Sequence, residues 1–524
     1  MEDVGESNYK WLISQPEISI ISLDFSAARG GQNIDFVEKY GFPAGKTLGV
    51  GIVDARNVWK VIPSEVMPVF TKLVAAKVTN IRIQPSGSLQ FCPWDFSLET
   101  STNMKSHPGA SVLAFAVQKL DEVVHVAKAF HSPTLFEGHE AAWEAFASAR
   151  TKALSPHAIV SAQRLRSMTE TELTRPEPYK VRRLKQLTDI PALPTTTIGS
   201  FPQTTEIRRL RAQWKKGSLT DEEYKAGIDQ QIAFCIGIQE AIGLDVLVHG
   251  EAERTDMVEF FAHQMEGMLF TSHGWVQSFG SRCVRPPIFW NDIVRPNAMT
   301  VREFVVAQKL TKKPVKGMLT GPVTILNWSF PRADITRKEQ AFQIGLCIRD
   351  EITDLEAAGC RVIQVDEPAL REGMPLRDAA KDEYLLWAVD SFRLATAGAK
   401  NETQIQTHMC YCEFKDCMGA IDRMDTDVNS IENSRSDNAT LEAFRSFGYD
   451  KGFGPGTYDI HSPVVPSMQH QKEKIESFLE VLEPDNIVVN PDCGLKTRTW
   501  PETIAALRNM VAATEKVRAE RGLL

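Results

Sequence analysis

The sequence lacks the features that define several large classes of protein. It contains no uninterrupted apolar run of about 18 residues, the length that a membrane-spanning helix requires. The first ten residues, MEDVGESNYK, are acidic and polar, unlike a secretory signal peptide. The formal net charge is −8, which is unfavourable for a general nucleic-acid-binding protein. These absences predict a soluble, cytoplasmic protein that binds neither membranes nor nucleic acids.

Nucleotide-binding loops are also missing. The sequence has no P-loop of the form GxxxxGK[ST], and Gly49-Val50-Gly51 lacks the third glycine and the helix start of a dinucleotide-binding loop. Cysteine is scarce: the chain has nine, an odd number in a long sequence without a signal peptide. This usage is typical of a reducing compartment, where clustered thiols are more often metal ligands or core residues than disulfides.

The remaining composition is that of a globular protein, with 43% hydrophobic and 24% charged residues. From about residue 195 onward, short β-rich runs alternate with stretches of helical spacing, such as 221–243 and 337–359, each with a glycine near its end. This alternation over roughly 330 residues predicts an α/β protein with a C-terminal (β/α)8 barrel. A proline pair places the insertion at 280–290 in a loop. The β-rich runs are 195–201, 245–251, 315–320, 361–367, 404–410, 427–432, 454–461 and 486–493.

Most of these runs end on a polar residue or a potential metal ligand. Because the C-terminal strand ends of a barrel meet at one mouth, where the active site lies, we expect these side chains to lie close together. One such residue can arise by chance, but packing alone does not explain so many. The residues are Ser200, Glu251, Asp366, His408 with Cys410, Glu432, His461 and Cys493.

His408 and Cys410 form an H-x-C pair within the run THMCYC. Side chains two residues apart in a strand point the same way, so the pair offers an imidazole and a thiolate to one ion. Zinc prefers four nitrogen, sulfur or oxygen ligands, and Glu432 and Cys493 complete such a set. For Cys493 the alternative is a buried core thiol, a common state of free cysteine.

Glu251 and Asp366 both follow apolar runs. Paired acids in a barrel mouth suit a substrate ammonium group, because each accepts charge-assisted hydrogen bonds. The alternative is a salt bridge to a nearby arginine such as Arg254 or Arg371.

Two further residues are candidates for binding or chemistry. His461 precedes Ser-Pro at a predicted strand end and can donate a proton near neutral pH. Trp328 follows a predicted strand and can stack on a flat heterocycle. Both residue types also occur as ordinary core residues, which is the alternative for each.

Three motifs near the start of the chain recur near its end, in the same order and at similar spacing. Residues 1–137 are therefore predicted to be the last strands of a second, duplicated and incomplete barrel. Residues 138–190 are predicted to form a helical connector, and 191–524 the catalytic, zinc-binding barrel. The paired motifs are SLDFS from Ser22 and SIENS from Ser430, GVGIVD from Gly49 and GPGTYD from Gly454, and NIRIQPSGSL from Asn80 and NIVVNPDCGL from Asn486.

The N-terminal copy lacks the metal-binding residue types. Asp24 stands at the position of Glu432, and Gly87 at that of Cys493, so no metal site is expected there. Three strands also leave a sheet edge with unpaired backbone groups. We expect the C-terminal barrel or a partner to cover this edge, unless the chain is a shortened form of a longer protein. Coincidence between short β motifs is the alternative to duplication.

A series of longer motifs stands in fixed order along the chain. They are IGSFP from Ile198, HGEAERTDMVEFF from His249, GSRCVRPP from Gly280, LTGPVTILNWSF from Leu319, QVDEPALREGMPL from Gln364, THMCYCEF from Thr407, SIENSRSD from Ser430, DIHSPVVPS from Asp459 and NPDCGLKTR from Asn490. Together they resemble the cobalamin-independent methionine synthases, which transfer the methyl group of 5-methyltetrahydropteroyltriglutamate to homocysteine. The resemblance covers residues 190–524 and, more loosely, 15–135. Members have two face-to-face barrels, of which the C-terminal one carries the metal.

The resemblance implies a role for each matching residue. His461 matches the proton donor of the family, and the implied cofactor is zinc (Zn²⁺). The implied zinc ligands are His408, Cys410, Glu432 and Cys493. Homocysteine is implied to contact Ile198, Gly199, Ser200, Glu251 and Asp366, and the folate to contact Arg282, Cys283, Trp328 and Glu372.

The sequence departs from the family pattern at its front. Full-length members begin with early strands of the first barrel, which carry a basic motif for the polyglutamate tail, and no counterpart is present. One alternative function is therefore the same zinc-thiolate chemistry with another donor, such as a monoglutamyl folate or a methyl-corrinoid. Another is a non-catalytic, truncated zinc-binding paralogue, although the intact ligand positions argue against it.

Overall fold

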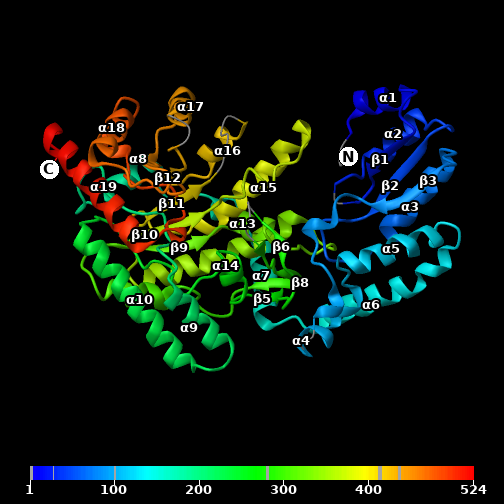
Figure 1. The fold of residues 1–524 in the computed structure, drawn as a ribbon, viewed down its shortest axis with the longest axis horizontal. Coiled ribbons are helices and arrows are strands. Elements are labelled where there is room, and N and C mark those ends of the chain that lie inside the picture. Colours follow the sequence, from blue (N-terminus) through cyan, green and yellow to red (C-terminus); the bar gives the residue numbers. More distant parts are fainter. Residues whose placement is uncertain are drawn as a thin grey trace.

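The computed structural model describes residues 4–27, 29–99, 102–278, 283–410, 416–434 and 438–523. A small N-terminal part and a larger C-terminal part lie side by side, and a helical segment joins them (Figure 1). None of the helices in the described ranges is both long enough and apolar enough to cross a membrane.

The C-terminal part is built around a curled parallel sheet with the strand order β13-β12-β11-β10-β9-β4. Every residue of β9 and β10 is buried, which explains why most residues of these strands are apolar. The strands are β4 (Leu247–Val248), β9 (Val315–Thr320), β10 (Val362–Asp366), β11 (Gln404–Met409), β12 (Val428–Ile431) and β13 (Gly452–Pro455).

Backbone hydrogen bonds continue beyond both edges of this sheet. Segment 487–490 bonds to β13 and to segment 194–196, which in turn bonds to residues 245–246 just ahead of β4. The backbone pairing therefore runs all the way around the curled sheet. This arrangement brings the ends of all eight predicted β-rich runs to one side.

Four of the predicted strands are wrong in extent, among them run 245–251, of which only Leu247–Val248 forms β4. Runs 195–201 and 486–493 contribute isolated bridges rather than full strands, and β13 ends at Pro455 instead of continuing to residue 461. In the second run Pro491 cannot donate a ladder hydrogen bond. In the first, the chain leaves the ladder to approach the loop after β4, where Phe201 N donates to Gly250 O at 3.1 Å.

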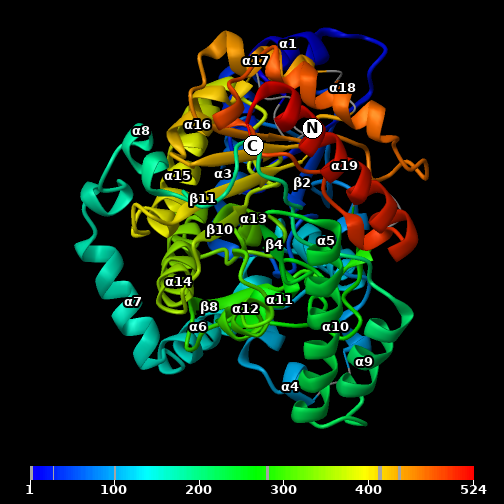
Figure 2. The same cartoon turned by 90° about the vertical axis from the view of Figure 1, so that its left-hand side faces the viewer.

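Helices surround the curled sheet (Figure 2). The two predicted helical stretches are confirmed as α10 and α14, and Gly243 and Gly359 after them have positive φ angles of 95° and 92°. Capping boxes begin α10, α14 and α19. The helices are α9 (Thr205–Lys215), α10 (Asp221–Ile242), α11 (Glu259–Ala262), α12 (Val301–Gln308), α13 (Pro322–Asn327), α14 (Arg337–Ala357), α15 (Asp378–Thr396), α16 (Met418–Arg423), α17 (Ala439–Phe447), α18 (Met468–Leu479) and α19 (Trp500–Arg521).

An antiparallel insertion lies between β4 and β9. It pairs β5 with β8 and β6 with β7. The loop predicted at 280–290 is wrong at its ends, because Cys283–Val284 and Ile288–Val294 are strands; residues 279–282 lie outside the described ranges. The proline pair lies between these strands, where no ladder donor is needed. The strands are β5 (Glu266–Leu269), β6 (Val276–Gln277), β7 (Cys283–Val284) and β8 (Ile288–Val294).

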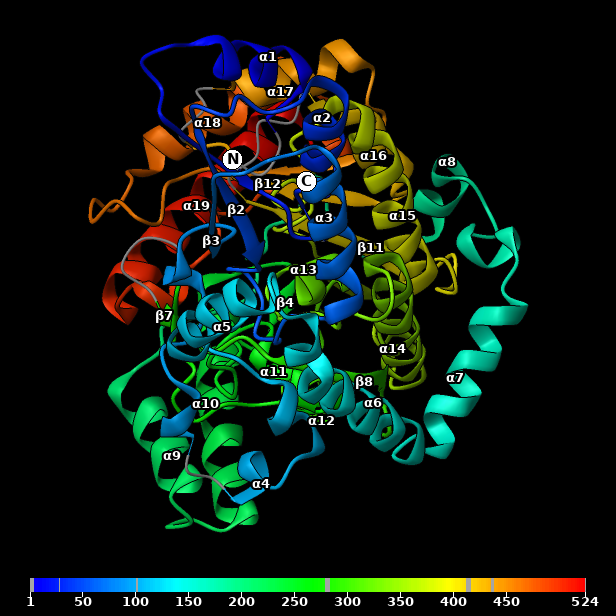
Figure 3. The ribbon, with the colours of Figure 1, turned by 90° about the vertical axis from the view of Figure 1, so that its right-hand side faces the viewer.

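The N-terminal part contains a three-stranded parallel sheet in the order β1-β2-β3 (Figure 3). It has a hydrophobic core of its own, built from these strands and the helices beside them. Its elements are α1 (Glu6–Ser14), β1 (Ile20–Asp24), α2 (Asn33–Tyr40), β2 (Thr47–Val53), α3 (Pro63–Ala75), β3 (Ile81–Pro85), α4 (Thr102–Lys105) and α5 (Ala116–Ala129).

The N-terminal sheet and the end of the C-terminal sheet share a local packing arrangement. Ser22 pairs with Gly49 in the first, and Ser430 pairs with Gly454 in the second. A Cβ on either glycine would lie 2.5 Å from the Oγ atom of its paired serine. It would also lie 2.6 Å (Gly49) or 2.5 Å (Gly454) from an amide oxygen of the next segment. Each glycine therefore leaves room for a serine and an amide from its two neighbours.

A helical segment of α6 (Glu137–Lys152), α7 (Pro156–Ser167) and α8 (Tyr179–Arg182) passes around the outside of the C-terminal part (Figures 2 and 3). Its end is fastened by the fully buried Arg182, which lies 2.9 Å from Asp427 and 3.1 Å from Asp425. A buried arginine held by two carboxylates fixes the segment to the sheet end opposite the predicted site.

Candidate metal centre and active site

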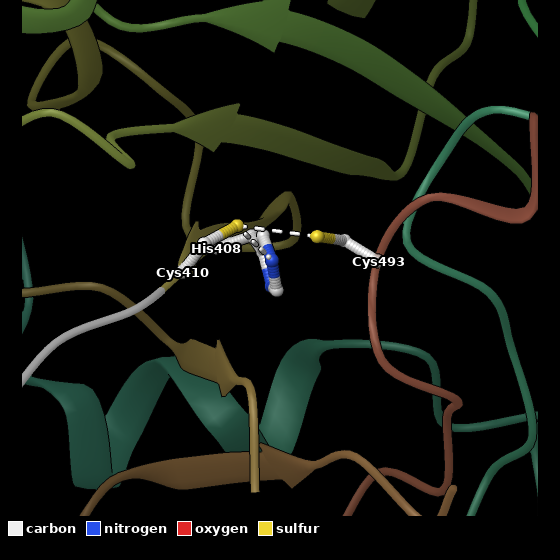
Figure 4. A group of neighbouring side chains, drawn as sticks. All are labelled: His408, Cys410 and Cys493. Carbon is white, nitrogen blue, oxygen red and sulfur yellow. Dashed lines mark hydrogen bonds between the residues drawn. The ribbon is translucent and has the colours of Figure 1, made fainter. Parts of the chain in front are cut away.

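Three side chains with metal-binding atoms converge at the end of the curled sheet (Figure 4). His408 lies in β11, Cys410 follows that strand, and Cys493 follows segment 487–490. His408 Nε2 lies 3.0 Å from Cys410 Sγ, which lies 3.2 Å from Cys493 Sγ. Within the described ranges, these three residues form a group whose ligand atoms all lie within 4.8 Å of one another.

Cys410 and Cys493 form no disulfide, and their sulfur atoms are joined by a hydrogen bond. The hydrogen bond from Cys410 holds the pKa of Cys493 well below its usual range, and burial opposes this effect. The same hydrogen bond and burial raise the pKa of Cys410. Burial is the largest single effect on His408 and lowers its pKa, but the hydrogen bond to Cys493 and the negative charges of Cys493, Asp366 and Asp492 together raise it. Of the two thiols, Cys493 therefore gives up its proton more readily than Cys410.

The donor set fits a divalent ion. His408 Nδ1 is buried and has no hydrogen-bond partner among the described residues. A buried imidazole nitrogen beside two partly buried sulfurs is costly to leave without an ion or a proton to join them. One nitrogen and two thiol ligands suit zinc better than magnesium or calcium, which prefer oxygen.

Glu432 directly follows β12, as predicted, but lies outside the three-residue group. Its charge nevertheless acts on that group, because it adds to the effects of Cys493 and burial that raise the pKa of Cys410. Its role as a fourth ligand stays a prediction.

Glu251 has a strained backbone next to Gly199. Its φ is +60°, an uncommon value for a residue other than glycine and one that often marks functional positions. A Cβ on Gly199 would lie 2.7 Å from Glu251 Oε1, so the missing side chain leaves room for this carboxylate. Arg254 Nη1 lies 3.5 Å from Glu251 Oε1, so the salt bridge given as the alternative role of Glu251 is present. It leaves the second carboxylate oxygen for other partners.

Asp366 is the last residue of β10 and is buried. The Gln364 amide donates to Asp366 Oδ1 at 2.8 Å and to Ile198 O at 3.0 Å. Burial raises the pKa of Asp366 to about 7, and nearby His408 and Gln364 oppose this rise. Gln364 thus links Asp366 to Ile198, and Glu251 lies beside Gly199, with Ser200 next in the chain.

Trp328 does not directly follow a strand, and that prediction is wrong. The short helix α13 lies between it and β9, because a Gly-Pro pair after the strand starts a helix. The indole of Trp328 is half-buried and donates to Glu372 Oε2 at 3.0 Å. Cys283 is exposed in β7, within the insertion, and Arg282 lies outside the described residues.

His461 lies beyond β13, in a turn, rather than at the strand end. Asp459 Oδ1 accepts its backbone N–H at 2.8 Å and fixes the turn. The hydrogen bond from Cys410 lowers the pKa of Cys493 most, and a smaller electrostatic effect of His461 acts in the same direction. His461 therefore lies close enough to Cys493 to influence its pKa.

Sequence reasoning missed the polar residues beneath this site. Lys316 and Gln364 are buried in β9 and β10, among apolar neighbours. The lysine in the run VKGMLT could have predicted them, because a charged side chain inside a buried strand needs buried polar partners.

Two sequence-family models match the chain. The model described as "Cobalamin-independent synthase, Catalytic domain" matches residues 193–516, more than half of the chain. The model described as "Cobalamin-independent synthase, N-terminal domain" matches residues 3–77.

Curated relatives are similar over almost the whole chain. A 5-methyltetrahydropteroyltriglutamate–homocysteine methyltransferase of Synechococcus sp. (strain JA-2-3B'a(2-13)) is 53% identical over 99% of this chain and 67% of that protein. The protein of the same name from Bacillus cereus (strain ATCC 14579) is 48% identical over 99% of this chain and 68% of that protein. The chain thus spans about two thirds of the length of these relatives.

Solved structures share the fold. A B12-independent methionine synthase from Shewanella sp. W3-18-1, in complex with selenomethionine, has a TM-score of 0.55 at 22% identity. The match covers 64% of this chain and 100% of that one. A putative vitamin-B12 independent methionine synthase from Listeria monocytogenes has a TM-score of 0.50 at 16% identity, over 61% and 96% of the two chains. At these identities the likeness concerns the fold alone.

Proposed function

The chain belongs to the cobalamin-independent methionine synthase family, and on this premise we propose how its side chains carry out the reaction of that family. The protein is an enzyme of methionine biosynthesis. It transfers the methyl group of 5-methyltetrahydropteroyltriglutamate to homocysteine, so that both substrates are small molecules. Its localisation to the cytoplasm stays a prediction from composition.

The proposed cofactor is one zinc ion held by His408, Cys410, Cys493 and Glu432. The observation that carries this proposal is the convergence of one imidazole and two thiols within 4.8 Å at the sheet end. A free thiol with a pKa of about 8.5 is a poor nucleophile at neutral pH, and zinc, when bound, supplies the positive charge that keeps the homocysteine sulfur anionic.

Homocysteine is proposed to lie against Ile198, Gly199, Ser200, Glu251 and Asp366. Glu251 and Asp366 accept hydrogen bonds from its ammonium group, because both carboxylates lie at the sheet end where the substrate has to enter. The absent side chain of Gly199 leaves space beside the Glu251 carboxylate. These residues hold the substrate by its amino end and leave its sulfur to reach the metal centre.

The folate is proposed to contact Trp328, Glu372, Cys283 and Arg282. Trp328 holds the pterin flat, and its hydrogen bond to Glu372 fixes the indole plane. The leaving group is a tertiary amine, which departs readily only when protonated, and His461 donates that proton. Stacking and proton donation together align methyl group, nitrogen and sulfur for in-line displacement.

We also propose the finer architecture that the sequence predicts. Residues 191–524 form a (β/α)8 barrel, which the ring of backbone hydrogen bonds supports. Residues 1–137 correspond to the last strands of a duplicated barrel, and 138–190 are the connector. The shared serine–glycine packing of the two sheets supports the duplication, since unrelated sheets have no reason to share it.

A methyl-transfer assay on the purified chain tests the function. With a labelled methyl group on the triglutamyl folate, the chain should form labelled methionine, and a chelator should abolish this until zinc is restored. A monoglutamyl folate run in parallel measures what the glutamate tail contributes. A chain that binds zinc fully but transfers no methyl group from either folate would instead be a non-catalytic zinc protein.

Replacing Cys493 tests the metal centre. Cys493→Ser should lower zinc affinity by at least about 100-fold, since even the partners of metal ligands contribute 10- to 100-fold. Turnover should fall in parallel. Zinc content by plasma emission spectroscopy and methyl transfer measure the two effects.

Cys360→Ser is the matched control. Its thiol is buried in the same part of the fold but donates to Val362 O at 3.1 Å, a bond that serine can keep. It should retain zinc and activity. A fully zinc-loaded Cys493→Ser variant would exclude Cys493 from the ligand set.

A further inference from the structure

Lys316 is a fully buried lysine inside the curled sheet. It lies in β9, and only 1% of its surface is exposed. Burying an ammonium group is costly unless hydrogen bonds replace the lost water. A residue with this cost, directly beneath the proposed homocysteine site, requires an explanation.

The surroundings of Lys316 fit its charged form. Its Nζ atom donates to Gln364 Oε1 at 2.6 Å, to Thr197 O at 2.7 Å and to Gln406 Oε1 at 3.3 Å. An ammonium group has three N–H donors and no acceptor, so these three oxygens use all of them. Burial lowers the pKa of Lys316 to about 7, and the charges of Asp366 and Glu251 oppose this.

The lysine fixes which way the Gln364 amide faces. Because the charged form of Lys316 can only donate, Gln364 has to present its oxygen to this ammonium group and its NH₂ group to the other side. That NH₂ group donates to Asp366 Oδ1 at 2.8 Å and to Ile198 O at 3.0 Å. If the amide were reversed, its oxygen would face these two acceptors and repel them.

Lys316 also fastens a segment that has few ladder bonds of its own. Residues 195–201 form an isolated bridge rather than a strand. The bond from Lys316 to Thr197 O, and that from Gln364 to Ile198 O, tie this segment to β9 and β10. The two sides of the proposed homocysteine site are therefore held together by one lysine and one amide.

We propose that Lys316 is a positioning residue for substrate binding: through Gln364 it orients the Asp366 carboxylate and the 197–198 backbone toward the ammonium group of homocysteine. The inference rests on the proposed role of Asp366. It adds a charged residue that touches neither the substrate nor the metal but determines the geometry of the group that binds the amine.

Lys316→Met tests this proposal, since methionine has similar length and no donor. The KM for homocysteine should rise about 10- to 100-fold, the range expected when a charge-assisted hydrogen bond of the substrate is lost. The KM for the folate and the zinc content should stay within twofold of wild type. Gln364→Leu keeps the lysine, breaks the same link and should act in the same direction, so it serves if Lys316→Met does not fold.

Lys313→Met is the matched control. Lys313 lies two residues before β9, and its Nζ donates to Leu244 O at 2.5 Å at the opposite end of the sheet. This variant should leave the KM for homocysteine unchanged, because Lys313 has no link to Gln364 among the hydrogen bonds of the described residues.

A substrate without the amino group separates positioning from a general structural role. The kcat/KM for 4-mercaptobutanoate, which is homocysteine lacking its ammonium group, should be the same for wild type and Lys316→Met. An equal loss with both thiols would overturn the proposal. If wild type transfers no methyl group at all, the proposed function fails. The role of Lys316 can then be tested by calorimetry, which compares the binding of homocysteine and of 4-mercaptobutanoate to zinc-loaded wild type and Lys316→Met.

Discussion

Asp24 and Glu432 show at the scale of single residues how surroundings determine what a carboxylate does. They occupy equivalent positions in the motifs SLDFS and SIENS, and both lie at the end of a parallel strand. The charge of Glu432 adds to the effects of Cys493 and burial that raise the pKa of Cys410, whereas Asp24 accepts hydrogen bonds from Ser26 N at 2.7 Å and Ser26 Oγ at 2.6 Å. In the N-terminal sheet, the carboxylate at this position therefore has a structural role.

Burial makes Asp24 a source of pH-dependent stability. It raises the pKa of Asp24 to about 6, against the opposing hydrogen bonds from Ser26. A raised pKa means that the folded state binds the proton more tightly than the unfolded state. The contribution is therefore complete below about pH 4 and is lost as the pH rises through about 6.

Asp24→Asn should remove this dependence, because asparagine keeps an acceptor for Ser26 and does not ionise. The free energy of unfolding of the variant, relative to wild type, should increase by up to about 3 kcal/mol between pH 4 and pH 8. Urea unfolding at the two pH values measures it. A constant difference between the two proteins would show that Asp24 stays ionised throughout this range.

At the scale of elements, the short helix α13 determines where Trp328 lies. Its N-terminus is held by the buried Glu367, whose carboxylate accepts from Val323 N at 3.0 Å, Thr324 N at 2.8 Å and Thr324 Oγ1 at 2.7 Å. A carboxylate at a helix N-terminus satisfies otherwise unpaired N–H groups and offsets the helix dipole. Such support matters because the helix is too short to be stable alone.

Gly321→Ala should disturb this helix start. A Cβ on Gly321 would lie 2.3 Å from the carboxyl carbon of Glu367, which would have to move. The expected cost is about 1–3 kcal/mol in thermal or urea unfolding, together with a raised KM for the folate as Trp328 shifts.

Gly237→Ala is the control, since this glycine lies inside α10 with no atom within 4 Å of an added Cβ. It should stabilise the protein by about 0.5–1 kcal/mol and leave the KM for the folate unchanged. An unaltered KM for the folate in Gly321→Ala would show that the position of α13 does not affect folate binding.

At the scale of the whole molecule, a few buried contacts join the N-terminal and C-terminal parts. Trp59 Nε1 donates to Pro331 O at 2.7 Å. The fully buried Glu99 accepts from Ser272 N at 2.7 Å and from His273 N at 2.8 Å. Glu99 thus connects the N-terminal part to the antiparallel insertion, which also carries Cys283.

Glu99→Gln should loosen this connection, because the amide replaces one acceptor by a donor that faces a backbone N–H. The expected cost is about 2 kcal/mol. Hydrogen exchange at residues 272–273 should become faster, while methyl transfer is retained. Glu140→Gln, on the exposed side of α6, is the control. Unchanged exchange at 272–273 in Glu99→Gln would mean that other contacts hold the two parts together.

The sequence alone determined the elements whose pattern is local. Helices α10 and α14 and strands β9 to β12 follow from apolar periodicity and from glycines at helix ends. The position of Asp366 and of Glu432 at strand ends follows as well, because a strand end and a polar residue after it are both visible within a few residues.

Only the tertiary structure decided which distant groups meet. Cys410 and Cys493, the course of segment 195–201, and the link from Lys316 through Gln364 to Asp366 all depend on how the sheet curls and closes. The helix before Trp328 likewise depends on Glu367, which follows a neighbouring strand. The physical reason is that hydrogen bonding and burial act through space, so a residue's partners follow from strand pairing rather than from its neighbours in sequence.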